Sequence, residues 1–272
     1  MNPNLARLSL NQMTTRSWGV REATDGCVRA EIPWIGLWRH KVTETGLKAS
    51  ARIVRDAGLK VSSLCRGGMF PAATKVERAA RVDDNRRAVE EAATLGTDVL
   101  VLVCGAAPDR DIDAARGMVE EGIERVLPYA EQAGVRLGIE PLHPSFAADR
   151  SVISTLGEAN GIVERLGSPV VGVVVDVYHV WWDPALYAEI RRARERILGF
   201  HVSDWLRGGG DPLVSRGMMG DGVIELRRMR ESVETAGYEG PIEVEIFNEQ
   251  VWTNPGDDAL RLMGERYLEH VL

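Results

Sequence analysis

The chain has 272 residues, of which 44% are hydrophobic, and it carries a formal net charge of -7 at pH 7. This length can bury a large core, either in one α/β domain or in two smaller ones. The acidic balance leaves no excess of Lys and Arg to neutralise phosphates, which argues against a nucleic-acid binder.

The cysteines and the apolar runs indicate the compartment. Cys27, Cys65 and Cys104 lie far apart without a C-x-x-C spacing, so we expect neither a disulfide framework nor a zinc knuckle. The first residues, MNPNLARLSLNQMTT, lack an apolar core of signal-peptide length, and no run reaches the ~18 apolar residues of a membrane span. We therefore expect an unexported, cytoplasmic protein with no membrane partner.

Short apolar runs alternate along the chain with longer amphipathic segments, which is typical of parallel strands joined by helices. The predicted strands cover residues 8–13, 32–37, 61–64, 99–104, 136–140, 171–175, 197–202 and 242–247. The predicted helices cover residues 43–57, 75–95, 111–133, 154–166, 184–196 and 225–236, with a weaker one at 16–29 and a closing one at 255–272. Several helices have a glycine just past the last periodic residue: Gly58, Gly96, Gly134, Gly167 and Gly237.

Eight strands alternating with helices fill about 250 residues, which is the usual size of a (β/α)8 TIM barrel. No linker, low-complexity tract or composition shift marks a second domain, so we predict one domain over residues 1–272. In such a barrel the carboxyl ends of all strands open on one face, where catalytic residues gather.

Polar side chains occur at the ends of the last four predicted strands: Glu140, Asp176, His179, His201, Asp204 and Glu245. A carboxylate on a buried strand needs a partner, and one divalent metal ion would satisfy several at once. Three carboxylates and one imidazole can close around a cation. Alternative interpretations exist for single residues. Glu243 and Glu245 lie two residues apart with the same side-chain direction, so one could be a salt-bridge partner of the other's neighbours instead of a ligand, and His143 in EPLHP suits a loop.

The order of these residues resembles that of the xylose-isomerase-like sugar isomerase/epimerase family of TIM barrels, in particular ketose 3-epimerases and inosose isomerases. The resemblance rests on residues 138–247, including the turn Gly220-Asp221-Gly222. It implies Glu140, Asp176, His201 and Glu245 as metal ligands. It also implies that His179, three residues after Asp176, and Arg207, six residues after His201, bind the substrate, and it places His143 where many relatives carry Asn.

Such a site would isomerise at a carbon next to a carbonyl. The metal would act as a Lewis acid on an enediolate, while Glu140 and Glu245 would serve as bases on opposite sides of the sugar. Three carboxylates with one imidazole favour Mn²⁺ or Mg²⁺, and leave Co²⁺ or Zn²⁺ open.

Aromatic and basic residues after the predicted strands indicate the pocket walls. Trp38, Trp181, Trp182, Trp205 and Trp252 follow strands, with Met69 and Phe70, and suit an apolar wall for a sugar ring. Arg66, and Arg39 or His40, are candidates for contact with a carboxylate or a phosphate. We include Trp38, Arg66, Trp181 and His143 among the predicted substrate-binding residues.

The leading hypothesis is a metal-dependent isomerase or epimerase of a keto sugar or keto cyclitol. The alternative is a lyase or dehydratase that begins with the same proton removal, as in 3-keto-glycoside cleavage or dehydroshikimate dehydration. An abasic-DNA endonuclease would need more histidines than the five present, and a non-catalytic sugar-binding role leaves the full ligand set unexplained. The sequence does not decide whether the protein forms a homo-oligomer.

Overall fold

The computed structural model describes residues 3–208 and 210–272 of the chain. Eight parallel strands close into a barrel in the order β1-β10-β7-β6-β5-β4-β3-β2. Their bounds are β1 (Leu8–Asn11), β2 (Trp34–Trp38), β3 (Lys60–Gly68), β4 (Val99–Val103), β5 (Arg136–Glu140), β6 (Val171–Asp176), β7 (Ile197–Val202) and β10 (Ile242–Val244). The predicted fold, a TIM barrel, is confirmed.

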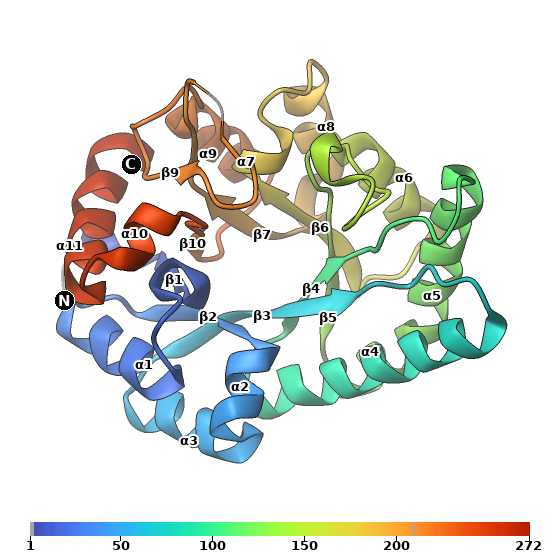
Figure 1. Ribbon diagram of the computed structural model, residues 1–272, viewed down its shortest axis with the longest axis horizontal. Helices are drawn as coiled ribbons and strands as arrows, with labels where there is room; N and C mark the ends of the chain where they lie inside the picture. The colour runs from blue at the N-terminus through green and yellow to red at the C-terminus, as the bar shows by residue number, and fades with distance from the viewer. Residues whose placement is uncertain (1–2, 209) are drawn as a thin grey trace.

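Helices surround this barrel on the outside (Figure 1). Their bounds are α1 (Val20–Arg29), α2 (Arg39–Thr45), α3 (Leu47–Asp56), α4 (Lys75–Leu95), α5 (Ile112–Ala133), α6 (Leu156–Leu166), α8 (Leu186–Ala193), α9 (Leu226–Thr235) and α11 (Gly256–Arg266). Two short helices, α7 (Val177–Val180) and α10 (Glu249–Thr253), follow β6 and β10. The last helix, α11, packs beside α1, so the two ends of the chain meet on one side of the barrel (Figure 1).

Local sequence signals account for where several helices begin and end. Thr74 and Thr155 each accept a hydrogen bond from the backbone three residues ahead and open α4 and α6. Gly96, Gly134 and Gly167 end α4, α5 and α6 in the left-handed conformation, as the glycine positions predicted.

Some predicted bounds are wrong, and backbone geometry explains each difference. The predicted helix 43–57 is interrupted at Gly46, whose φ of 90° is not helical, so α2 and α3 form in its place. The first strand ends at Asn11, because a 3₁₀ helix (Gln12–Thr15) begins there with the Asn11 side chain as its cap. The predicted closing helix 255–272 changes to a π-helical turn at Tyr267–Val271.

Strands β6 and β7 are buried at every residue, as expected for strands covered on both faces. Their apolar side chains pack into the main core between barrel and helices. The buried strands therefore hold their carboxyl ends rigidly, and these ends carry the polar residues of the site. No helix within the described ranges combines the length and the apolar character that a bilayer crossing requires.

The connection from β7 to α9 contains a two-stranded antiparallel hairpin that the sequence did not predict. It consists of β8 (Asp204–Trp205) and β9 (Arg216–Gly217). Asp204 is buried, and its carboxylate accepts hydrogen bonds from the backbone amides of Trp205, Gly220, Gly222 and Ile224 at 2.9–3.0 Å. A Cβ at Gly222 would lie 2.4 Å from Asp204 Oδ1, so the Gly-Asp-Gly turn requires glycine there. Asp204 therefore fixes the loop.

Candidate active site

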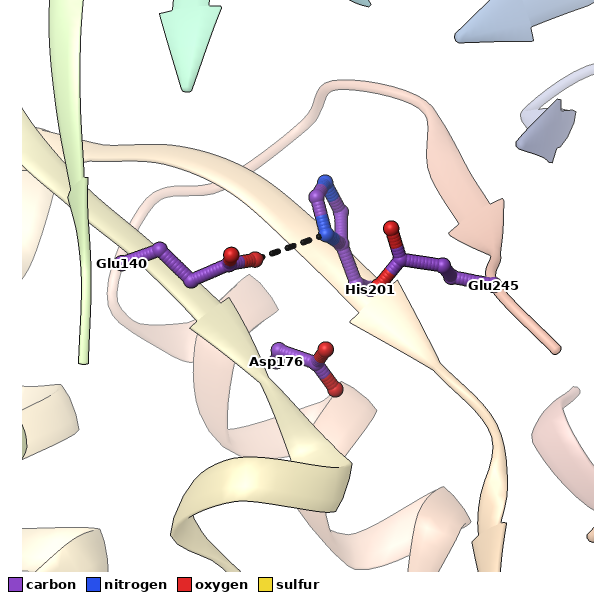
Figure 2. Close-up of side chains that lie close together, drawn as sticks. All are labelled: Glu140, Asp176, His201 and Glu245. Atoms are coloured by element: carbon purple, nitrogen blue, oxygen red, sulfur yellow. Dashed lines mark ion pairs between the residues drawn. The ribbon is translucent and has the colours of Figure 1, made fainter. Parts of the chain in front are cut away.

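Four side chains from neighbouring strands meet at the carboxyl end of the barrel. Glu140 and Asp176 end β5 and β6, His201 lies near the end of β7, and Glu245 follows the last residue of β10. One ligand atom from each lies within 4.8 Å of all the others, and all four residues are buried. Figure 2 shows Glu140 and Glu245 entering from opposite sides, with Asp176 and His201 between them. The structure thus brings together the four residues predicted as metal ligands.

The His201 ring is positioned between two carboxylates. Its Nδ1 lies 3.1 Å from Glu140 Oε1, on the side of the cluster, and its Nε2 lies 3.9 Å from Glu243 Oε2. Glu243 accepts hydrogen bonds from buried side chains, namely Asn11 Nδ2 at 2.6 Å, Ser62 Oγ at 2.7 Å and Ser63 Oγ at 3.0 Å. At 3.9 Å Glu243 makes no hydrogen bond to the ring, but its charge favours the orientation that keeps Nε2 on its side and Nδ1 toward the cluster. Glu243 is thus placed as a positioning residue.

Arg216 brings a guanidinium into the cluster from β9, and sequence reasoning missed it. Its Nη1 donates to Asp176 Oδ2 at 2.9 Å and to Glu245 Oε2 at 2.8 Å, while Nη2 lies 3.0 Å from His179 Nε2. The guanidinium carbon lies 4.6 Å from the centre of the Tyr178 ring. The one local feature of the sequence that points to the burial of Arg216 is that it directly precedes Gly217 and two methionines, which are buried.

Arg207, which was predicted to reach the substrate, lies exposed in the loop between the two strands of the hairpin. It does not line the cavity described below. The prediction of Arg207 rested on its place six residues after His201, whereas the hairpin brings Arg216 to the cluster.

Burial and crowding of carboxylates control the protonation of the cluster. Burial raises the pKa of Glu245 to about 8; Arg216 opposes this shift and Glu140 adds to it. Burial alone would lower the pKa of His201, but Glu243, Glu140 and Glu245 raise it to about 10. Burial also lowers the pKa of His179 to about 3, so this ring is neutral. At neutral pH, Glu245 and His201 therefore hold protons in the absence of a cation.

The four residues fit a divalent cation. Metal–ligand distances of about 2.0–2.2 Å place two ligands on opposite sides of an ion about 4.0–4.4 Å apart, close to the 4.8 Å limit of the cluster. Glu140 Oε1 and His201 Nδ1 are buried in the described structure with no hydrogen-bond partner, and they face each other. An ion between them would satisfy both atoms.

A cavity of about 310 Å³ opens onto this cluster. Glu140, Glu245, His179 and Arg216 contribute polar groups to its lining. Aromatic side chains form much of the wall: Trp38, Phe146, Phe247 and Trp252. Further out the lining includes basic side chains, namely Arg16, His40, Arg66 and Arg150. A cavity with apolar walls and few converging polar groups is typical of a small-molecule site.

Some of the other predicted substrate-binding residues line this cavity, and some do not. Trp38 and Arg66 line it, but Trp181 and His143 do not. Trp181 packs against Trp205 with ring centres 5.7 Å apart, and His143 packs against Trp205 at 4.8 Å. These rings form a cluster beside the cavity, where the backbone amide of His143 lies 3.2 Å from His179 Nδ1.

Comparison with known proteins identifies the class to which this fold and site belong. Residues 26–266 match the family model described as xylose isomerase-like TIM barrel, and the chain belongs to this family. The match covers the strands that carry all four cluster residues.

Particular relatives span nearly the same length. The chain is 24% identical over 214 residues to the L-ribulose-5-phosphate 3-epimerase UlaE of Salmonella typhimurium, covering 76% of this chain and 72% of that protein. A Sinorhizobium meliloti protein of known structure is 51% identical, with a TM-score of 0.96 and 98% of each chain covered. The structure of the IolI protein with a zinc atom has the same fold, with 17% identity, a TM-score of 0.85, and 97% and 98% of the two chains covered.

Proposed function

We propose that this protein is a divalent-metal-dependent isomerase or epimerase of a keto sugar or keto cyclitol. The observation that carries the proposal is the buried group of Glu140, Asp176, His201 and Glu245 at the floor of a cavity of small-sugar size. The 3-epimerase activity named for the curated Salmonella relative supports the same class of chemistry.

Glu140, Asp176, His201 and Glu245 would hold the ion, and their donor set suits Mn²⁺ or Mg²⁺, with Co²⁺ or Zn²⁺ open. When bound, a divalent ion supplies Lewis acidity that polarises a substrate carbonyl and stabilises the negative charge formed when the adjacent carbon loses its proton.

Glu140 and Glu245 carry the proton transfer in this proposal. They enter the cluster from opposite sides, from β5 and after β10, so each faces a different side of a substrate lying between them (Figure 2). One carboxylate removes the proton from the carbon next to the carbonyl, and the other returns a proton to the opposite face. Return to the opposite face inverts the carbon, which is epimerisation.

His179 and Arg216 bind the substrate in this proposal, and Arg216 takes the role that the sequence assigned to Arg207. Both line the cavity, and they contact each other at 3.0 Å. The pKa of His179 is low, so its ring is neutral, and Nδ1 accepts a hydrogen bond from the backbone amide of His143. The proton of the neutral ring is then on Nε2, which can donate to a substrate oxygen. The Arg216 guanidinium offsets negative charge that develops on the substrate during proton removal.

The test is a panel of keto sugars, keto cyclitols and 3-keto-glycosides incubated with the Mn²⁺-loaded protein in D₂O and followed by NMR. We expect loss of one α-proton signal and the appearance of an epimer or isomer with deuterium at that carbon. An alkene would instead support the lyase alternative, which shares the first proton removal. Absence of exchange from every member of the panel would contradict the proposal.

The metal assignment has its own control in the same protein. Asp176→Asn and His201→Ala should each reduce the metal content measured after loading and dialysis, and should lower the exchange rate in parallel. Arg207→Gln, which alters an exposed residue outside the cavity, should retain the metal content of the wild type. Unchanged metal content in both cluster variants would show that the ion binds elsewhere.

A further inference from the structure

We propose that the substrate carries an anionic group, a phosphate or a carboxylate, which binds Arg66 and Arg150 on the β3–β5 side of the cavity. This inference rests on the proposed function and narrows its substrate class. The residues that carry it lie away from the metal cluster, so the inference can fail while the isomerase proposal stands.

Two arginines in the cavity lining make no side-chain hydrogen bond to a carboxylate among the described residues. Arg66 lies in β3 and is only partly exposed, yet no ion pair or side-chain hydrogen bond joins it to any residue that the structure describes. Burial and the neighbouring Arg150 both lower the pKa of Arg66, and the negative charge of Glu140 offsets this only in part. Arg150 Nε is buried without a hydrogen-bond partner, and its nearest described carboxylate is Asp149, 3.7 Å away and exposed.

A nearby arginine, in contrast, has carboxylate partners. Arg39, one residue after β2, donates to Asp84 and Glu91 over distances of 2.6–3.2 Å and is held by both carboxylates. A partly buried guanidinium without a partner costs stability, because its desolvation is not offset. The absence of a hydrogen-bonded carboxylate beside Arg66 and Arg150, among the described residues, therefore indicates that a ligand supplies further negative charge.

The carboxylates at the floor of the cavity offset the charge of Arg66 only in part, through Glu140. The carboxylates of Glu140, Asp176 and Glu245 would be balanced by a divalent ion together with the Arg216 guanidinium, which already contacts two of them. Arg16 adds another positive charge at the cavity lining, stacked over the Trp252 ring at 4.6 Å. Guanidinium groups that face a cavity and have no hydrogen-bonded carboxylate are suited to bind the oxygens of a phosphate or carboxylate.

The barrel order sets the direction in which such a substrate would lie. Strand β3, which carries Arg66, is separated from β7 by three strands in either direction around the barrel, so the two face each other across it. A keto sugar whose carbonyl end lies at His201 and Arg216 would extend its other end toward Arg66. Arg150 reaches the same region from the segment after β5, which pairs with Gly105 after β4.

The first test measures binding without turnover. Inorganic phosphate and glycolate are titrated by calorimetry into the Mn²⁺-loaded and metal-free wild type, Arg66→Gln and Arg150→Gln. At least one of the two anions should bind the wild type in both metal states, and each substitution should weaken it about tenfold or more, as expected for loss of a charge-assisted hydrogen bond. Arg81→Gln is the matched control, because Arg81 shares a neighbouring surface hollow with Arg66 but does not line the cavity.

The second test uses the α-proton exchange assay with matched substrates: a neutral ketose, its terminal phosphate and the corresponding keto-acid sugar. One charged substrate should exceed the neutral one in kcat/KM by about 10²-fold, and Arg66→Gln should remove most of that preference through KM. The better of the two charged substrates identifies the anion as phosphate or carboxylate.

Equal kcat/KM for neutral and charged substrates, with no effect of Arg66→Gln or Arg150→Gln, would overturn the inference while leaving the isomerase proposal intact. If no substrate exchanges its proton, the isomerase proposal fails, and the titrations still decide whether the anion site exists. Anion binding that is unchanged by both arginine substitutions, or weakened equally by Arg81→Gln, would also overturn the inference.

Discussion

Arg216 is the residue through which the β8–β9 hairpin reaches the cluster of Glu140, Asp176, His201 and Glu245. Its guanidinium contacts Asp176, Glu245 and His179 at 2.8–3.0 Å. Its position depends on a long loop whose path no short-range pattern encodes. The four cluster residues could be predicted, because each lies within one residue of the carboxyl end of an apolar strand: Glu140, Asp176, His201 and Glu245. Residues within strands have a fixed place in the barrel, whereas loop residues do not.

Arg216 and Arg207 form a matched pair for mutation. Arg216→Gln should lower kcat/KM for α-proton exchange by about 10²–10³-fold, because it removes a charge that offsets negative charge developing on the substrate. Arg207→Gln should remain within about twofold of the wild type, since Arg207 is exposed and outside the cavity. Steady-state kinetics with thermal melting of both variants make the measurement. A larger loss in Arg207→Gln would assign the substrate role to the loop after all.

The pKa values of the cluster residues set the direction in which metal affinity changes with pH. The pKa of Glu245 is about 8 and that of His201 about 10, so both are protonated at pH 7 and a cation must displace their protons. Metal affinity should therefore rise as the pH increases from 6 to about 9. Calorimetry in buffers of different ionisation enthalpy should show that metal binding releases protons at pH 7 and releases fewer of them at pH 9. Affinity that falls over this range would contradict the assigned protonation.

At the scale of elements, β2 and β10 support the cluster from beneath. Gly36 in β2 leaves room for the Glu243 carboxylate, because a Cβ at this position would lie 2.1 Å from Glu243 Oε1. Glu243 in turn lies 3.9 Å from His201 Nε2. A glycine in one strand therefore helps to orient a histidine ring held by another.

Gly36→Ala should displace Glu243 and thereby disturb His201. We expect a loss of about 1–3 kcal/mol in the free energy of unfolding, as for overpacking of a core, and a metal affinity weakened by about 10–100-fold. Urea unfolding and metal titration provide the two measurements. Gly264→Ala is the control, because nothing lies within 4 Å of its added Cβ in α11, and it should keep or slightly raise stability. A Gly36→Ala protein with wild-type stability and metal affinity would contradict this role.

The sequence predicted the elements better than their ends. The strands were evident from apolar runs, and helices such as α4 had both a cap and a terminal glycine. The break at Gly46 and the β8–β9 hairpin were not evident, because each depends on backbone angles or pairing that a period of hydrophobic residues does not encode. The unpredicted hairpin affects the site directly, since it leaves Arg207 outside the cavity and brings Arg216 to the cluster.

At the scale of the whole molecule, the closed order of the barrel places β5, β6, β7 and β10 side by side, so four residues distant in sequence share one floor. The same order puts Arg66 of β3 across from β7. The four-residue cluster and the two arginines without a hydrogen-bonded carboxylate thus lie on different sides of one cavity. The fold and the cluster follow from the pattern of strands, while the charge balance of the cavity required the positions of the side chains.

The central claim is that Glu140 and Glu245 transfer the α-proton of a substrate held at this cluster. The most direct test is deuterium exchange from D₂O into a keto substrate that the wild type converts. The exchange rate is compared between four Mn²⁺-loaded proteins: the wild type, Glu140→Gln, Glu245→Gln and the double variant. Glutamine keeps an oxygen donor for the ion, so metal content measured in parallel should be partly retained. Each single variant should exchange about 10²–10⁴-fold more slowly, as expected for loss of a general base, and the double variant should show no exchange. Exchange at the wild-type rate in a metal-containing double variant would contradict the claim.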